Sequence, residues 1–535
     1  MDRRTFLKAG AAVALLPAMR PAFAADGEKE LRIAMTLSDI PNTTGQATQG
    51  GEGIRFIGRT IYDMLFKWDL SVTDRPAELV PSLAESYTID EAGTTWTFKL
   101  RQGVKFHDGS DFNADAAIWN LDKLRKQDAP QFDQMQAGLA SSYFVGVTGY
   151  EKIDDYTIAI TTEAPDSLFF YRVANIAFSS PARWEEVGGD WLKFAEKPSG
   201  TGPFILESFT PRERADLVKN PDYWDKESIA KVDRLTLFAM PDATTRVAAI
   251  LSGQVDWVEA PPPDAVPRLK QSGIDIYSNV YPHIWPYWLS FYGDSPFTDI
   301  RVRKAANLAI DRDGLVNFLG GLAKAAKGSV DVSSPWFGNP TFDIKYDPEE
   351  AKKLLAEAGY GPDKPCEITL LTSTAGSGQM QPLPMSEFVQ ENLNAVGFDV
   401  KIESVDWETL RARRRLRADG EENKGVYGLN NSWNLADPDF GFMSVMMSDR
   451  APPNGNNWGL YSDPKADELG AAVKAALDPK ERDAAIAALH EYVVDQAVWI
   501  WVVHDLNPRA LAPKVKGFRP PQSWYVDLTQ IDIEV

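Results

Sequence analysis

The chain has 535 residues and exceeds the roughly 250–300 residues at which one hydrophobic core stops growing, so two or more domains are expected. Hydrophobic residues make up 44% and charged residues 25% of the chain, a balance that excludes a disordered or fibrous protein. The formal net charge of −20 makes nucleic acid and anionic lipid headgroups poor partners, because such a surface repels both.

Residues 1–24 have the pattern of a cleavable export signal. A basic start precedes a short apolar run over residues 9–17, and the small residues Ala22 and Ala24 follow. Arg3 and Arg4 resemble a twin-arginine signal, although ordinary secretion stays open. We expect cleavage after Ala24. This removes four basic residues and one acidic residue and leaves a net charge of −23.

The rest of the chain contains no apolar segment of the ~20 residues that a membrane-spanning helix needs, so the mature protein is expected to be soluble and exported. Cys366 is the single cysteine, which excludes an intrachain disulfide. It lies in the strand-like run CEITLLTS, where a buried, small apolar role is expected rather than a catalytic one.

Strand-like and helix-like segments alternate in the N-terminal half. A strand over 31–37 precedes a polar loop over 38–53 and a helix that begins at Ile54. The alternation of apolar and polar residues over 94–110 predicts a β-hairpin. Asn113 is placed to cap the helix that follows it.

The C-terminal half continues the pattern. Asp347 and Asp478 each precede a proline and an acidic first turn, which predicts capped helices. The run VWIWVV predicts a buried strand, and Gly397 ends a helix before another strand. A further helix begins near Asp406 and carries the basic run Arg411–Arg417, for which a solvated face is predicted. Together these segments predict a mixed α/β protein.

Eight segments in the expected order, spread over some 300 residues, give the chain its resemblance to a family. They are ELVPSLAESYTI, TTWTFKLRQGVKFHDGSDFNADAAIWNL, SGTGPFIL, KNPDYWD, AILSGQVDWVEAPPP, FTDIRVRKAANLAIDRDGLV, YDPEEAKKLLAEAGY and LNAVGFDVKIESVDW. The chain resembles extracellular solute-binding protein family 5, the peptide, nickel and opine receptors of ATP-driven importers.

The resemblance implies a periplasmic-binding-protein-like fold of two lobes with an additional third domain. Lobe I would combine residues 26–55, 198–280 and 505–535, the extra domain would span 56–197, and lobe II would span 281–504. It further implies a monomeric periplasmic receptor that closes about a hinge on a small solute and delivers it to the permease subunits of an ABC importer. No enzymatic activity and no cofactor are expected.

The segment NNSWNLADPDFGF lies where the family places ligand contacts in lobe II. Trp433 would offer a flat wall, Asn434 lies beside it, and Asp437 would pair with an ammonium group or accept sugar hydroxyls. Peptide-binding members carry an acidic residue three positions after this tryptophan, and here that residue is Ala436. This departure puts the amine-binding role of Asp437 in question, and a turn-capping role stays open for it.

Further ligand contacts are expected from five more residues. Trp285 and Trp288 flank Pro286, which argues against a helix and predicts an irregular wall of the cleft. Family position alone adds Asp39, Trp458 and Tyr461.

No metal site is expected, because the four histidines are scattered without paired-ligand spacing; they are His107, His283, His490 and His504.

The ligand class stays open between a peptide, an opine or other amino-acid conjugate, and an oligosaccharide. Peptides and amino-acid-derived solutes are favoured because they dominate the family. A secreted hydrolase that uses Asp437 and Asp439 is disfavoured. Two residues that lie so near each other on one segment cannot flank a scissile bond from opposite sides. A chaperone that holds peptides without transport is the third alternative.

Overall fold

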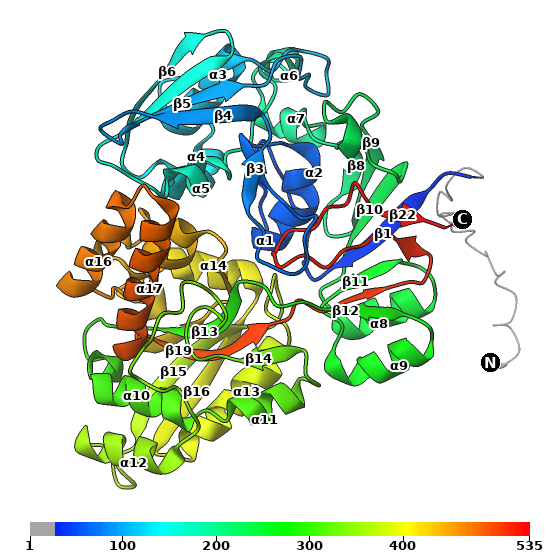
Figure 1. Cartoon of the computed structure of the whole chain (residues 1–535). Coiled ribbons are helices and arrows are strands. Elements are labelled where there is room, and N and C mark those ends of the chain that lie inside the picture. The colour runs from blue at the N-terminus through cyan, green and yellow to red at the C-terminus, as the bar shows by residue number, and fades with distance from the viewer. Residues whose placement is uncertain (1–26, 535) are drawn as a thin grey trace, which may run out of the picture.

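The computed structural model describes residues 27–534, and three large β-sheets organise them (Figure 1). The first sheet is mixed and has the strand order β12-β20-β11-β1-β10-β9-β8. All of its strands come from the three segments expected for lobe I. They are β1 (Glu30–Met35), β8 (Phe204–Thr210), β9 (Arg214–Lys219), β10 (Arg234–Ala239), β11 (Trp257–Glu259), β12 (Asp275–Tyr277) and β20 (Arg509–Leu511).

The second sheet has the order β14-β19-β13-β17-β15-β16, with β18 paired to β13. Its strands fall within the segment expected for lobe II, except that β19 extends one residue beyond it. Helices cover both of its faces, and each face has its own hydrophobic core. Its strands are β13 (His283–Leu289), β14 (Ala323–Ala325), β15 (Cys366–Ser373), β16 (Phe398–Val405), β17 (Val426–Asn430), β18 (Trp433–Asn434) and β19 (Trp499–Asp505).

The third sheet is antiparallel, has the order β4-β5-β7-β6, and lies with its helices at the top of Figure 1. It belongs to the segment expected for the extra domain. Its strands are β4 (Ala84–Ile89), β5 (Thr95–Leu100), β6 (Val147–Asp154) and β7 (Thr157–Thr162). Two small sheets pair β2 (Phe66–Trp68) with β3 (Leu79–Pro81) and β21 (Val515–Lys516) with β22 (Asp532–Ile533).

The helices follow the same division. Those of the lobe I segments are α1 (Gly50–Gly53), α8 (Ala243–Leu251) and α9 (Val266–Gln271). A π-helix (Ile54–Gly58) crosses the boundary to the extra-domain segment, in which α2 (Arg59–Ile61) follows. The extra domain contains α3 (Ala114–Arg125), α4 (Gln134–Ala140), α5 (Phe169–Val173), α6 (Pro181–Glu186) and α7 (Trp191–Glu196). The segment 281–504 contains α10 (Ile300–Ala309), α11 (Arg312–Phe318), α12 (Pro348–Glu357), α13 (Pro382–Asn394), α14 (Trp407–Arg415), α15 (Ser444–Met446), α16 (Pro464–Ala475) and α17 (Pro479–Asp495).

The predicted helix starts are confirmed by their side-chain caps. Asn113 accepts a hydrogen bond from the amide of Ala116, and Asp347 accepts one from the amide of Glu350. Asp478 and Asp406 cap α17 and α14 in the same way. Each cap satisfies amides that a helix leaves unpaired in its first turn.

The predicted hairpin over 94–110 is wrong. Its first half is strand β5, but β5 pairs with β4 and β7, which are distant segments. The second half forms a turn with one isolated bridge between Lys105 and Asp111. Alternation predicts a strand, but it does not say which strand is the partner.

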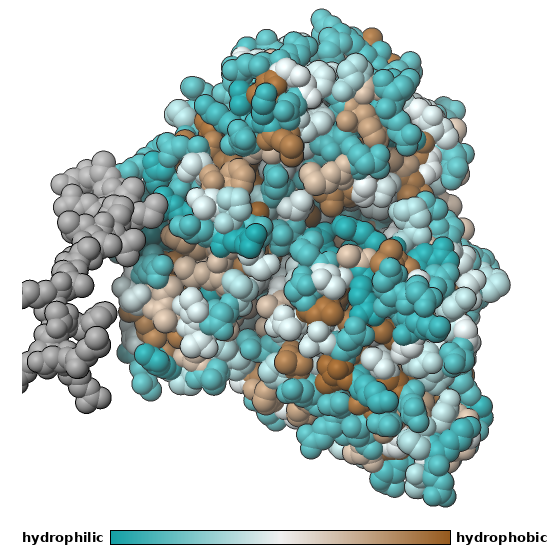
Figure 2. All heavy atoms as spheres, turned by 180° about the vertical axis from the view of Figure 1, so that it is seen from behind, coloured by the Kyte–Doolittle hydropathy of each residue, from teal (hydrophilic) through white to brown (hydrophobic). Residues whose placement is uncertain are grey.

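The fold subdivides as the family resemblance implies, although the exact domain boundaries stay a prediction. Among residues 27–534, no helix is both long and apolar enough to cross a bilayer. Figure 2 shows that the face seen from behind is mainly hydrophilic, with apolar residues in small separate groups. The predicted export signal lies outside the described residues.

Candidate functional site: a cavity between the lobes

A cavity of about 590 Å³ lies where lobe I, the extra domain and lobe II meet. Lobe I contributes Gly50, Gly51 and Ile54, and the extra domain contributes α4 with the turn that follows it. Lobe II contributes α14 and the segment after β17, and the C-terminal segment adds Trp524 and Tyr525. All three parts of the fold therefore form its wall.

A second cavity, of about 520 Å³, is lined only by residues 55–80, 203–228 and 517–530. None of these residues comes from lobe II. Closure of the two lobes would not enclose a solute there, so the first cavity is the candidate site.

One face of α14 forms the lobe II wall of this cavity. Trp407, Arg411, Arg414 and Arg415 all line it. Arg411 lies four residues after Trp407, and Arg414 and Arg415 lie three and four residues after Arg411, which places the four on one side of a helix. The prediction of a solvated face for this basic run is thus wrong for Arg411, which is buried, whereas Arg414 is half-buried and Arg415 is exposed. The spacing was visible in the sequence, but what the face contacts depends on the tertiary fold.

Arg414 is the central cation of this wall. Its guanidinium lies 5.3 Å from the ring centre of Trp433, and its Nη1 donates to Asn431 Oδ1 at 3.2 Å. Burial, together with the charges of Arg411 and Arg415, lowers the pKa of Arg414 to about 9, so it remains charged at neutral pH. Its Nε is buried and has no hydrogen-bond partner within the described chain.

Several other buried donors at the cavity lack a partner. The indole nitrogens of Trp407 and Trp524 and the side-chain nitrogen Nε2 of Gln46 make no hydrogen bond among residues 27–534. Buried donors without partners are rare in folded proteins, because each one costs free energy. No sequence pattern pointed to Trp524, because it lies in an irregular segment.

Trp433 lines the cavity as predicted and is held in place by its own loop. Its ring stacks on Phe440 with 4.3 Å between centroids, and its indole nitrogen donates to the Phe440 carbonyl at 3.2 Å. Asn434 also lines the cavity, and its side chain accepts a hydrogen bond from the Ala436 amide. Both residues are placed where a solute would touch them.

Asp437 lines the cavity but is already engaged. Its carboxylate accepts hydrogen bonds from the amides of Asp439 and Phe440 and from the side chain of Asn175, at 2.9, 3.1 and 3.3 Å. Burial, with the nearby charge of Asp439, raises the pKa of Asp437 to about 7. The turn-capping role and a position at the cavity are thus combined in one residue.

Trp285 and Trp288 belong to the fully buried central strand β13 and do not form an irregular cleft wall. Period-two alternation directs Trp285 into one core of the lobe II sheet and Trp288 into the other. Pro286 is accommodated at an irregularity in the pairing with β19, so it does not end the strand.

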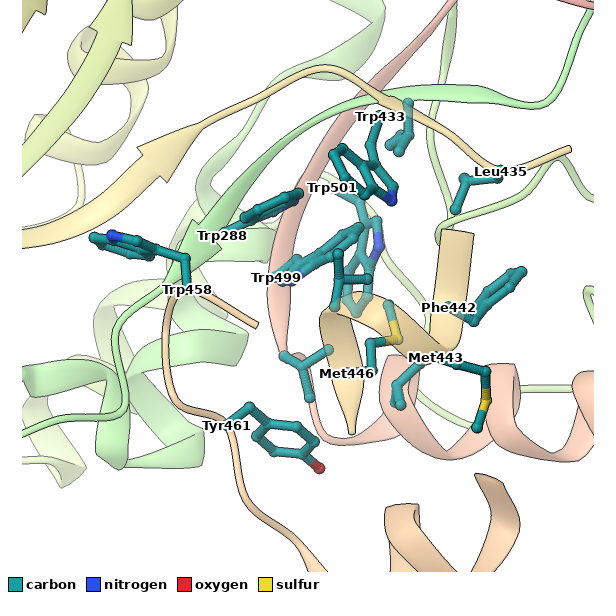
Figure 3. Close-up of a cluster of buried hydrophobic side chains, with 14 of the residues drawn as sticks. Trp288, Trp433, Leu435, Phe442, Met443, Met446, Trp458, Tyr461, Trp499 and Trp501 are labelled. Carbon is teal, nitrogen blue, oxygen red and sulfur yellow. The ribbon is translucent and has the colours of Figure 1, made fainter. Parts of the chain in front are cut away.

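Trp458, Tyr461 and Asp39 also lie away from the cavity. Figure 3 shows Trp458 and Tyr461 with Trp288 and Trp499 in a cluster of buried apolar side chains. Asp39 accepts hydrogen bonds from the amide of Ile40 beside it and from that of Arg212, in the turn between β8 and β9. Contact of these three residues with a solute stays a prediction that this geometry does not support.

His107 and His490 have structural contacts. His107 contacts the carbonyl of Gly202 at 3.0 Å, and His490 accepts from the amide of Ser329 at 2.9 Å. Within residues 27–534 no group of three or more His, Cys, Asp or Glu side chains is arranged to hold a metal ion. Cys366 is buried, and burial raises the pKa of its thiol to about 12.

Comparison with known proteins decides the family. The model of the bacterial extracellular solute-binding proteins, family 5 (middle), matches residues 78–454, which is more than half of the chain. The chain belongs to this family. The resemblance inferred from the eight segments is thereby confirmed.

Curated relatives of this family 5 protein match it over nearly their full length. The glutathione-binding protein GsiB of Escherichia coli K12 is 28% identical over 476 residues, 86% of each chain. The heme-binding protein A of Haemophilus influenzae is 28% identical over 488 residues, 86% of this chain and 84% of its own. These relatives are solute-binding proteins, so the expectation of a receptor and not an enzyme is confirmed.

Solved structures of low sequence identity share the fold. A dipeptide-binding protein of Pseudoalteromonas sp. SM9913, in complex with Met-Leu, has a TM-score of 0.82 at 24% identity and covers 95% of this chain and 100% of its own. NikA of Staphylococcus aureus, in complex with Ni(L-His)2, has a TM-score of 0.77 at 19% identity and covers the same shares. The expected periplasmic-binding-protein fold is confirmed. The family 5 chain is accordingly a solute-binding protein of the kind that serves ABC importers.

Proposed function

We propose that this protein is the periplasmic receptor of an ABC importer and binds a peptide or an amino-acid-derived solute, such as an opine, in the cavity between its lobes. The observation that carries the proposal is the cavity itself, because both lobes and the extra domain line it. Its volume of about 590 Å³ lies within the ~300–1,000 Å³ that is typical of small-molecule sites.

The contacts across the cavity suit a receptor that closes on its solute. The amide of Glu52 in lobe I donates to the hydroxyl of Ser377 in lobe II at 2.8 Å. Asn175 of the extra domain reaches Asp437 of lobe II. Apolar contacts also join these parts, because Trp68, Tyr281 and Trp524 belong to one hydrophobic cluster. About 5.5 kcal/mol of differential binding shifts an open population to a closed one.

The relatives favour a peptide-like solute. GsiB is a glutathione-binding protein, and the Pseudoalteromonas relative in structure was solved with a dipeptide. An oligosaccharide is the second candidate, favoured by the indole faces of Trp407, Trp433 and Trp524 at the cavity. Export by the signal at residues 1–24, action as a monomer and delivery to permease subunits complete the proposal.

A thermal-shift screen of the mature protein against peptides, glutathione, opines and oligosaccharides tests the ligand class. A ligand at 100 times its dissociation constant stabilises the folded state by about 2.7 kcal/mol. Gly138 lines the cavity and has open space where a Cβ would stand, so Gly138→Trp should fill the cavity and abolish the shift.

Gly149 gives the matched control, since it also has open space at its Cβ but lies on β6 and does not line the cavity. Gly149→Trp should keep the full ligand shift. A solute that stabilises both variants equally binds elsewhere, and that result would contradict the proposed site.

A further inference from the structure

One turn of the extra domain lies inside the hydrophobic core of lobe II. Leu168 is 0% exposed and belongs to the apolar cluster on one face of the lobe II sheet. Every other buried member of this cluster comes from residues 281–504. Figure 1 shows the short helix α5, which begins one residue later, beside α16 and α17 of lobe II. Leu168 is therefore a knob that packs across two parts of the chain which hinge closure would bring together.

Ser167 binds the end of α16 next to this knob. Its amide donates to the Lys474 carbonyl and its hydroxyl donates to the Val473 carbonyl, both at 2.8 Å. Both carbonyls lie in the last turn of α16, where a helix leaves its carbonyls without the usual partners four residues on. A residue 306 positions away in the chain thus caps this helix.

The turn that carries the knob is fixed to the extra domain. Asp166 accepts a hydrogen bond from the Leu168 amide at 3.1 Å and forms a buried ion pair with Arg172. Arg172 also donates to the carbonyl of Val145 at 2.8 Å. Because the turn is already ordered by these contacts, little conformational entropy is lost when the knob packs against lobe II.

Two more contacts with lobe II follow on the same segment. The ring of Tyr171 packs against the lobe II cluster, and the guanidinium of Arg482 on α17 lies 5.5 Å from the centre of that ring. Asn175 donates to Asp437. Of residues 166–175 only Asn175 lines the cavity, so most of these contacts are made away from the solute.

We propose that residues 166–175 form a latch between the extra domain and lobe II, which holds a fraction of the molecules closed before a solute binds. Leu168 and Ser167 are its positioning residues. This inference rests on the hinge closure of the proposed function and assigns part of the control of affinity to residues that do not touch the solute. The latch strengthens the binding of any solute, because the apparent dissociation constant is the intrinsic one divided by the closed fraction.

The test measures the distance between the extra domain and lobe II in the mature protein without any solute. Glu151→Cys on β6 and Glu468→Cys on α16 place spin labels at two exposed positions. Cys366 is fully buried and should not react, and labelling of the protein without the two new cysteines checks this. Pulsed electron-spin resonance should give a shorter distance, that of the closed form, and a longer one. Leu168→Ala should lower the ratio of closed to open molecules about tenfold or more, because most of the knob is removed.

Three further variants separate the latch from folding. Leu168→Met keeps the size of the knob and should keep the wild-type distances. Ser167→Ala loses one hydrogen bond and should shift the ratio in the same direction by up to about tenfold, so it carries the test if Leu168→Ala does not fold. Leu121→Ala is the matched control, because Leu121 is 1% exposed in the core of the extra domain itself. It should lower the melting temperature without changing the distances.

The inference is overturned if the wild type has no closed population without a solute, or if Leu168→Ala and Ser167→Ala leave the ratio unchanged. An equal change in Leu121→Ala also contradicts it, since the effect would then follow from any loss of packing. The proposed function is judged separately by the thermal-shift screen. A stabilising solute together with unchanged distances in the latch variants keeps the receptor role and removes the latch. Altered distances without any stabilising solute keep the latch and remove the proposed ligand classes.

Discussion

Two charged regions of the molecule differ in how their charges are neutralised. In lobe I, Glu259 accepts hydrogen bonds from Arg509 at 3.0 Å, from the indole of Trp257 at 2.7 Å and from Arg55. On the cavity wall of lobe II, Arg414 faces no carboxylate within ion-pair distance among residues 27–534. Both groups are removed from water, but only the first has its counter-charges inside the protein.

The difference indicates separate tasks. Burial alone would raise the pKa of Glu259, but Arg55 and Arg509 lower it overall, so the carboxylate stays ionised and holds β11, β20 and the π-helix together. The charge of Glu259 is thus balanced by arginines of the protein itself. Arg414 and Arg415 of α14 form no ion pair within the described residues, and we therefore propose their wall as the functional one.

The largest expected effect follows from breaking the complete network. Glu259→Gln removes the carboxylate that pairs with both Arg55 and Arg509, so the free energy of unfolding should fall by about 3–5 kcal/mol. Denaturant unfolding of the mature protein measures it.

Glu207 provides the control for this loss. It pairs with Arg234 in the same lobe, but its side chain is 51% exposed. Glu207→Gln should therefore cost less than about 1 kcal/mol. Equal losses of unfolding free energy in Glu259→Gln and Glu207→Gln would show that the buried network contributes no more to stability than the exposed ion pair.

A second pair of variants compares an indole that has a partner with one that has none. The Trp285 nitrogen donates to Gln379 at 3.0 Å in the core, whereas the Trp407 nitrogen at the cavity donates to nothing within the described chain. Tryptophan to phenylalanine removes the same atoms at both positions. Because Trp285→Phe leaves Gln379 without its hydrogen-bond donor, the free energy of unfolding should fall by ~1–3 kcal/mol in addition to the loss from the smaller ring. The affinity of this variant for the solute should not change.

Trp407→Phe should show the reverse pattern. Its unfolding free energy should change less than that of Trp285→Phe, because no protein hydrogen bond is lost. Its affinity for the solute found in the thermal-shift screen should fall by up to about tenfold, measured by calorimetry. Unchanged affinity in Trp407→Phe would show that this indole does not donate to the solute.

The fold was largely predictable because its signals are local. Aspartate and asparagine caps located the starts of α3, α12, α14 and α17, and these held in the structure. The pairing of β5 was not predictable, since its partners are set by distant segments. Pro286 suggests an irregular segment, yet it lies inside strand β13. An irregularity in the pairing with the distant strand β19 accommodates the proline there.

The site was only partly predictable. Trp433, Asn434 and Asp437 were found because the family resemblance pointed to their segment, and all three line the cavity. The face of α14 was read as solvated because helical spacing tells which residues share a face but not what covers it. Four of the predicted residues lie in the sheet cores or their neighbouring loops, where large aromatic side chains are usual; they are Trp285, Trp288, Trp458 and Tyr461.

The smallest expected effect concerns the pH dependence of stability at Asp437. Its folded pKa of about 7 lies above the unfolded value near 3.9, so the folded state binds more protons between these limits. Stability from this group is therefore lost as the pH rises from about 4 to 7. Lowering the pH from 8 to 6 should stabilise the wild type by about 1 kcal/mol relative to Asp437→Asn.

Denaturant unfolding of the wild type and of Asp437→Asn at pH 8 and pH 6 measures the effect. Subtracting the change in the variant from that in the wild type cancels the contributions of the other titrating groups, including Asp505. Charged groups beside Asp437 are Asp439, which is held by Arg450 at 2.8 Å, and Arg172. If a solute's ammonium group pairs with Asp437, its affinity should instead rise as the pH passes 7, and Asp437→Ala should then cost about 3–5 kcal/mol of binding. An affinity independent of pH, and unchanged in the alanine variant, would leave Asp437 as a turn cap without a role in binding the solute.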